Sequence, residues 1–287
     1  MGAHLAILNG FGRTLGDGII GLQALHAVRA RGVLNKPVVL YRLPGLPKLV
    51  QALYAAAPAE ILELPWNDAA PGRPFAADGC AKAIDLRDFA FDPGFRGVAM
   101  IDYFLAALGD QPSQVPAALK RNTWLAPTMN CPKAAHNPYV LVCPRSAMTL
   151  RDMPERVHLH ILDWLARNTD APVLTQATLP PAADLAALCT LVAGARLLIS
   201  TDTAMVHLAD AFSVPCLAFF TTHRPEWRVR DYPLCRSVYL PVAGLPPALE
   251  FARDDSDIIA AQAAWTGGET GLHWLTAALA RAWEKWA

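Results

Sequence analysis

The sequence LISTDTAMVHLA, residues 198–209, predicts an apolar strand that ends in a polar turn and leads directly into a helix. Thr203 and His207 lie four residues apart, on a helix face that the apolar spacing leaves available for chemistry. The first amides of this helix have no intrahelical acceptors and lie at the positive end of the helix dipole, which suits a phosphate. Four apolar residues at helical spacing are expected to be buried, namely Met205, Leu208, Ala209 and Phe212.

Strand-like apolar runs alternate with helical patterns along the chain, which is typical of parallel sheets with crossover helices. The expected fold is α/β, with two doubly wound Rossmann-like domains that face a central cleft, where the strands' carboxyl ends would bind ligands. Strands are predicted at 5–9, 38–41, 60–64, 83–85, 139–143, 173–176, 197–200 and 216–220. Helices are predicted at 17–30, 47–57, 99–108, 155–168, 182–193, 203–212 and 271–287.

Proline-broken sequence without a sustained period divides the chain. We expect an N-terminal Rossmann-like domain over residues 1–126, a linker over 127–138 and a C-terminal Rossmann-like domain over 139–265. Residues 266–287 are expected to form a C-terminal helix with an apolar face that must dock on the protein. Residues 65–74 are predicted to form a surface loop.

Composition excludes several classes of function. The 25 basic and 25 acidic side chains balance, so nucleic acid is not an expected partner. No apolar run reaches the roughly 18 residues of a spanning helix, and no signal peptide is visible. We therefore expect a cytoplasmic protein, with peripheral association at the inner face of the inner membrane left open. The six cysteines have no C-x-x-C spacing and are expected to be free thiols, so no metal and no cofactor is predicted.

The glycine-rich segment GFGRTLGDG, residues 10–18, follows the first predicted strand and leads to Asp17. This aspartate fits a helix cap or a first-turn acid favoured by the dipole, and it also fits a general base that removes a proton from an attacking hydroxyl. Arg13 and Thr14 in the same loop are candidates for acceptor binding. The glycines at 10, 12 and 16 leave open a dinucleotide site instead, with Arg42 at a 2′-phosphate, and hence an NADP-dependent oxidoreductase.

The second half of the chain carries polar side chains after several strands. Residues 144–154 contain Ser146 and Arg151, a hydroxyl and a guanidinium of the kind that binds phosphate. The alternative is that the arginines of this loop pair with Asp152 and Glu155. Asp202 would repel phosphate, so it fits a helix cap or an acceptor for sugar hydroxyls. Thr222 lies in the loop at 221–227, which borders the same predicted site.

Three segments together resemble glycosyltransferase family 9, the ADP-heptose lipopolysaccharide heptosyltransferases. Residues 15–25 resemble the family's Gly-Asp motif with its following helix, residues 151–154 its basic-x-Trp-Pro segment, and residues 202–207 its Asp-Thr-Gly-x-x-His motif. The resemblance implies a GT-B fold and an inverting transfer of a sugar, ADP-heptose being the implied donor. The N-terminal domain would then bind the acceptor and the C-terminal domain the nucleotide sugar.

The resemblance also implies roles for individual residues. Asp17 matches the family's proposed base, and Ser146 and Arg151 match its phosphate-contacting positions. Thr203, Ala204 and Met205 would offer backbone amides to the diphosphate, with Asp202 near the sugar and His207 completing the motif. The acceptor would be a glycan, a lipid-linked molecule or a protein.

Three departures from the family pattern keep a further alternative open. Ala204 stands where the motif has glycine, Met153 stands where it has tryptophan, and no acidic residue that could hold the donor ribose is identified between Gln176 and Asp184. A catalytically degenerate, nucleotide-binding transferase homologue would show the same departures.

Overall fold

The computed structural model describes residues 4–77, 79–131, 139–266 and 271–286. The chain divides into two compact units, Met1–Met129 and Asn130–Ala287. This division falls inside the segment predicted as a linker. Residues 127–129 of that segment belong to a short helix, α4 (Leu125–Met129), and its residues 132–138 lie outside the described part of the chain.

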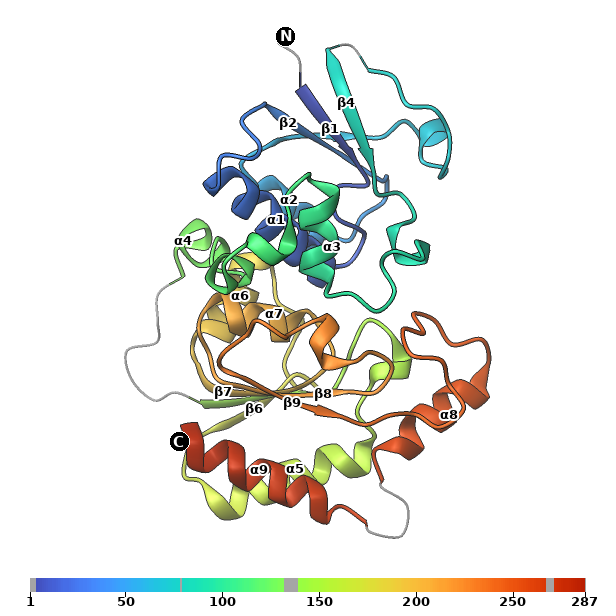
Figure 1. Ribbon diagram of the computed structural model, residues 1–287. Coiled ribbons are helices and arrows are strands. Elements are labelled where there is room, and N and C mark those ends of the chain that lie inside the picture. Colours follow the sequence, from blue (N-terminus) through green and yellow to red (C-terminus); the bar gives the residue numbers. More distant parts are fainter. Residues whose placement is uncertain (1–3, 78, 132–138, 267–270, 287) are drawn as a thin grey trace. The chain divides into compact units, whose positions relative to one another are not determined.

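The first unit is built on a parallel sheet with the strand order β3-β2-β1-β4. Its strands are β1 (His4–Leu8), β2 (Val38–Arg42), β3 (Glu60–Glu63) and β4 (Cys80–Asp85). Its α-helices are α1 (Leu15–Ala30), α2 (Lys48–Ala55), α3 (Met100–Ala107) and α4, and its short 3₁₀ helices are η1 (Trp66–Asp68), η2 (Phe89–Phe91), η3 (Pro112–Gln114) and η4 (Ala117–Lys120). Figure 1 shows α1, α2 and α3 gathered beside this sheet.

Two different layers cover this first sheet. On one side α1 packs against α2 and α3. The rings of Phe11 and Phe104 pack edge to face there, with their centroids 5.2 Å apart. The other side is covered by the connection from β3 to β4, which contains one 3₁₀ turn and places Phe75 4.7 Å from the ring of Tyr41. Residues 65–74 of this connection are largely exposed, as predicted. The buried guanidinium of Arg87 holds this loop in place by donating hydrogen bonds to three of its backbone carbonyl oxygens.

The second unit contains a five-stranded parallel sheet with the order β6-β5-β7-β8-β9. Its strands are β5 (Tyr139–Cys143), β6 (Val173–Thr175), β7 (Ala195–Thr201), β8 (Cys216–Phe220) and β9 (Cys235–Tyr239). Its helices are α5 (Glu155–Asn168), α6 (Leu185–Ala193), α7 (Ala204–Ala211), α8 (Asp255–Ala264) and α9 (His273–Trp286), with the 3₁₀ helices η5 (Thr149–Arg151) and η6 (Pro225–Trp227). In Figure 1, α5 and α9 lie on one face of this sheet and α6 and α7 on the other, so the sheet is doubly wound.

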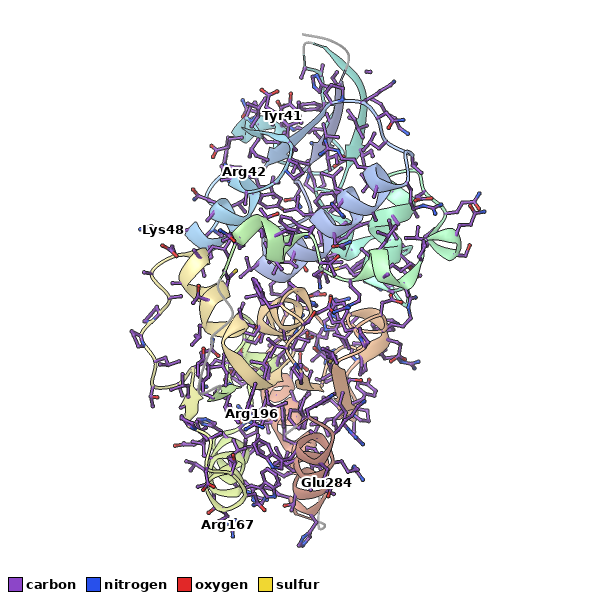
Figure 2. The ribbon with its side chains drawn as sticks, turned by 90° about the vertical axis from the view of Figure 1, so that its left-hand side faces the viewer. Tyr41, Arg42, Lys48, Arg167, Arg196 and Glu284 are labelled. Atoms are coloured by element: carbon purple, nitrogen blue, oxygen red, sulfur yellow. The ribbon has the colours of Figure 1, made fainter. Side chains whose placement is uncertain are left out.

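The predicted docking of the C-terminal helix is confirmed. Leu275 and Leu279 of α9 are buried in the core that Phe219 of β8 and Trp265 also form. Arg196 of β7 lies with its guanidinium 5.1 Å from the ring of Trp283, and Figure 2 labels Arg196 together with Glu284 on α9. The apolar stripe of α9 therefore completes the second unit rather than forming a separate element.

The α/β class with parallel sheets is confirmed. Besides the 3₁₀ helices η1–η6, the described residues contain two α-helices and one strand that the sequence patterns did not predict, namely α4, α8 and β9. The predicted strands and helices start or end within a few residues of their observed bounds. All six cysteines are free, with Cys143, Cys189 and Cys216 buried. Among the described residues, no helix is both long and apolar enough to cross a membrane.

Candidate functional site

The best-organised polar site of the second unit lies where the direction of strand addition reverses, between β5 and β7. These strands are paired with Cys143 opposite Ser200, so the loop after β5 and the turn after β7 meet at one edge of the sheet. The hydroxyl of Ser146 donates to the backbone oxygen of Asp202 at 3.2 Å, and the hydroxyl of Thr201 donates to the backbone oxygen of Arg151. Doubly wound sheets bind ligands at this switch point.

Helix α7 begins at this point with an uncapped first turn. Thr203 is its N-cap in extended conformation, but the Thr203 side chain makes no capping hydrogen bond, whereas side chains do cap α1, α6 and α8. Thr203 and Ala204 are both partly exposed. First-turn amides have no intrahelical acceptor, so the start of α7 can bind an anion as the sequence predicted.

Ala204 occupies the position of the motif's glycine without backbone strain. It is the first residue of α7, and it is not among the residues with a positive φ angle. Alanine has the highest intrinsic helix propensity, so the methyl group is tolerated by the helical backbone here. This departure from the family motif therefore does not distort the start of the helix.

Five ionisable side chains form a connected network beside the turn that joins β7 to α7. Arg151 contacts two carboxylates, with its Nη2 2.8 Å from Glu250 Oε2 and its Nε 3.7 Å from Asp202 Oδ2. His223 lies between the same carboxylates, with Nε2 3.0 Å from Glu250 Oε1 and Nδ1 3.5 Å from Asp202 Oδ2. Arg228 adds a contact of 3.5 Å to Glu250 Oε1. The network thus joins residues that follow β5, β7, β8 and β9.

The neighbouring side chains of this network stabilise the ionised forms of Asp202 and Glu250. Burial acts to raise the pKa of Asp202, but Arg151 and His223 outweigh it and hold that pKa well below its usual range. Burial likewise acts to raise the pKa of Glu250, and His223, Arg151 and Arg228 lower it to about 2. Both acids are therefore ionised at neutral pH, and Asp202 acts in an ion network. It is not the helix cap, because Thr203 holds that position.

His207 lies differently from the prediction that its helix face would be available for chemistry. Every residue of α7 from 205 to 211 is buried, and His207 is only 4% exposed. Its Nδ1 lies 2.9 Å from the hydroxyl of Tyr232. Burial lowers the pKa of His207 to about 4, so its ring is neutral at pH 7. The expectation that His207 lies on a different face from the buried stripe was wrong, because residues 205–211 of α7 are all buried, and a role in donor binding stays a prediction.

Asp17 lies in the first turn of α1, in the first unit. Its backbone amide donates to the hydroxyl of Thr14 at 3.2 Å, so Thr14 is the cap and Asp17 is the first-turn acid. Asp17 is partly exposed and Arg13 is exposed. The preceding turn is held by the buried hydroxyl of Tyr54, which accepts from the Phe11 amide at 2.8 Å. The same hydroxyl donates to the backbone oxygen of residue 12 at 3.2 Å.

The glycine-rich turn is occupied by the protein's own side chains. Gly10 and Gly12 have φ angles of 54° and 98°, which glycine adopts readily. A Cβ at Gly10 would lie 3.0 Å from the ring of Tyr54, and one at Gly12 would lie 3.0 Å from the ring of Phe89. The two glycines are therefore explained by their positive φ angles and by close packing against Tyr54 and Phe89. Arg42, labelled in Figure 2, ends β2 as predicted, but the turn beside it offers no support for the NADP alternative.

The remaining predicted residues are placed as follows. Arg145 is exposed and pairs with Asp152 at 3.3 Å, which confirms the alternative for that arginine. Arg151 pairs instead with Asp202 and Glu250, so that alternative was wrong for Arg151. Thr222 is buried, with its hydroxyl 3.2 Å from Nδ1 of His223.

Three members of the network were not among the site residues predicted from the sequence, namely His223, Arg228 and Glu250. His223 lies in the loop at 221–227 that the pattern assigned to binding, so position after a strand could have identified it. Glu250 follows no strand or helix pattern and lies 99 residues from Arg151 in the sequence. Only the folded chain brings these two residues together.

One family model matches part of the second unit. The model of glycosyltransferase family 9 (heptosyltransferase) matches residues 150–238, which contain the end of the loop after β5, the start of α7 and the loop after β8. This match confirms the resemblance over those residues. No curated protein matches the sequence.

Several solved structures share the fold at low sequence identity. TibC from enterotoxigenic E. coli H10407, described as a dodecameric iron-containing heptosyltransferase in complex with ADP-D-β-D-heptose, matches with a TM-score of 0.64 and 12% identity over 99% of this chain and 77% of its own. E. coli heptosyltransferase WaaC with ADP-2-deoxy-2-fluoro heptose matches with a TM-score of 0.56 and 12% identity over 82% of this chain and 92% of its own. E. coli ADP-heptose LPS heptosyltransferase II matches with a TM-score of 0.56 and 12% identity over 93% of this chain and 99% of its own.

The iron recorded for TibC has no evident counterpart among the residues described for this chain. Within residues 4–77, 79–131, 139–266 and 271–286, no group of three or more His, Cys, Asp or Glu side chains could hold a metal ion.

Proposed function

We propose that this chain, whose second unit carries the glycosyltransferase family 9 segment, is an inverting glycosyltransferase. It moves a sugar from a nucleotide diphosphate donor to an acceptor hydroxyl. The proposed donor is ADP-heptose, because structures of similar fold are heptosyltransferases and two of them contain ADP-heptose or its 2-deoxy-2-fluoro analogue. The proposed acceptor is a glycan, a lipid-linked molecule or a protein, met in the cytoplasm or at the inner face of the inner membrane.

One observation carries the proposal. Ser146, Arg151 and the uncapped start of α7 converge at the switch point of the second sheet. A hydroxyl, a guanidinium and helix N-terminal amides are the donors that bind the two phosphates of a nucleotide diphosphate. The family 9 match covers all of these except Ser146, which lies four residues before it.

The proposed reaction needs one base and one site for the leaving group. Asp17 takes the proton from the acceptor hydroxyl, whose oxygen attacks the anomeric carbon on the face opposite the diphosphate. The bond from that carbon to the phosphate oxygen breaks, and the nucleoside diphosphate leaves with the electron pair. Arg151 and the start of α7 stabilise the charge that grows on it, an effect worth about 3 kcal/mol for one well-placed donor.

The test is ADP release from ADP-heptose with water as the acceptor, compared with release from UDP-glucose and GDP-mannose. We expect ADP-heptose alone to be turned over. Asp17→Asn should lower the rate at least about 100-fold, the usual contribution of a general base, while leaving the ADP affinity unchanged. Asp170→Asn, at an exposed position between α5 and β6, is the matched control. A wild-type protein that binds ADP but hydrolyses no sugar nucleotide, and transfers none to a membrane extract, would be a degenerate homologue.

A further inference from the structure

Three nitrogen-bearing side chains converge on the carboxylate of Glu250. Arg151 Nη2 lies 2.8 Å from Oε2, and His223 Nε2 and Arg228 Nη2 lie 3.0 and 3.5 Å from Oε1. Glu250 belongs to the segment after β9, beyond the residues that match the family model. The three converging side chains come from the loop after β5 and the loop after β8.

Such convergence is the arrangement of an anion-binding site. The side chains of Arg228 and His223 are 6% and 0% exposed, and that of Arg151 is 14% exposed. Burying a guanidinium without an anion is strongly unfavourable, so a buried cluster of this kind requires negative charge whenever the ligand is absent. In this structure two carboxylates supply that charge: Asp202 contacts Arg151 and His223, and Glu250 contacts Arg151, His223 and Arg228.

We propose that Arg151, His223 and Arg228 form the subsite for the donor's diphosphate, and that Glu250 is its resident counter-ion, which the diphosphate displaces. This inference rests on the proposed function. Carboxylate and phosphate oxygens are bound by the same guanidinium geometry, so one anion can replace the other. The uncapped start of α7 lies in the same place, because Asp202 precedes it and contacts both Arg151 and His223.

The segment that carries Glu250 is suited to moving. Residues 241–253 form no helix or strand, and the Glu250 side chain, 23% exposed, is the most exposed of the network. Ala248 has a φ angle of 68°, a left-handed conformation that residues other than glycine seldom adopt. Its amide donates to the backbone oxygen of Thr222 at 2.7 Å, which holds the backbone at this point. Glu250 lies two residues further on, outside any helix or strand, so its side chain can turn away without disrupting an element of the fold.

The test uses inorganic pyrophosphate and ADP as probes in calorimetric titrations of the full chain. Glu250→Gln keeps the side-chain shape and removes the competing charge. Both probes should therefore bind this variant at least about tenfold more tightly than they bind the wild type. A factor of about ten is expected if Glu250 occupies the subsite in about nine-tenths of the ligand-free wild-type molecules. Glu226→Gln is the matched control, since Glu226 is exposed in η6 and makes the same change of charge near Arg228. Its affinity for both probes should equal that of the wild type.

Equal or weaker binding to Glu250→Gln would overturn the inference and make Glu250 a fixed positioning residue for Arg151. If Glu250→Gln does not fold, Arg228→Gln replaces it, and pyrophosphate affinity that does not fall in that variant overturns the subsite. The proposed function can fail separately. Glu250-dependent pyrophosphate binding without turnover of any sugar nucleotide refutes the transferase alone, and turnover with no effect of Glu250→Gln refutes the resident counter-ion alone.

Discussion

Replacing Glu250 by glutamine should lower the unfolding free energy of the ligand-free protein at neutral pH and make that free energy change less as the pH falls. The carboxyl of Glu250 has a pKa of about 2 in the folded chain against an ordinary value of 4.5. This difference corresponds to about 3 kcal/mol of unfolding free energy, since one pH unit is worth about 1.4 kcal/mol. The cause is the contact of Glu250 with His223, Arg151 and Arg228, which outweighs its burial.

The sign follows from the lowered pKa. A carboxylate with a folded pKa below its unfolded value stabilises the fold above pH 4.5 and loses that stabilisation as the pH falls toward 2. Glutamine imitates the protonated acid. The unfolding free energy of Glu250→Gln should therefore lie about 3 kcal/mol below that of the wild type at pH 7, and the gap should narrow to about 1.4 kcal/mol at pH 3.

Urea unfolding followed by tryptophan fluorescence at pH 7, 5, 4 and 3 measures this gap. Glu226→Gln, at an exposed position, should differ from the wild type by no more than about 0.5 kcal/mol at every pH. If the difference in unfolding free energy for Glu250→Gln stays constant with pH, the loss comes from packing and not from the ionisation of Glu250. A Glu250→Gln variant as stable as the wild type at pH 7 would show that desolvation cancels the ion contacts.

Three further outcomes are expected. Asp17→Asn should lose turnover and lower the melting temperature by no more than about 5 °C, measured by calorimetric scanning, because the cap at Thr14 remains and the charge of Asp17 in the first turn of α1 is lost. Tyr54→Phe should lower the unfolding free energy by about 1 to 3 kcal/mol in urea, because it leaves the Phe11 amide without its buried acceptor. Gly21→Ala should cost about 1 to 3 kcal/mol by the same measurement, since its Cβ would lie 2.0 Å from the Cβ of Phe11.

Much of the second unit could be predicted from sequence because its strands are apolar on both faces and its turns are polar. β7, β8 and the start of α7 appear where the pattern places them. β9 was missed because its sequence CRSVY forms a half-exposed edge strand without the apolar run of a central strand. α8 was not predicted because its alanines do not mark a clear apolar face. The side chain of Asp254 nevertheless caps its first turn, as is common at the start of a helix.

The site was predictable only in its local parts. Ser146, Arg151 and Thr203 follow strands that the pattern identified, and the topology of a doubly wound sheet brings them together. Two features depend on long-range packing instead. His207 lies in α7, whose residues 205–211 are all buried, and Glu250 contacts Arg151 from a segment without periodicity. No local pattern contains that information.

The most direct test of the central claim is a calorimetric titration of ADP into the wild-type protein, Arg151→Ala and Arg167→Ala. Arg167, labelled in Figure 2, is an exposed arginine of α5 whose partner is the nearby Asp163, so its removal controls for the loss of one positive charge. ADP should bind the wild type and Arg167→Ala equally and bind Arg151→Ala at least about tenfold more weakly, a loss of about 1.4 kcal/mol. Equal binding to all three proteins, or binding to none, would rule out Arg151 as a ligand of the donor diphosphate.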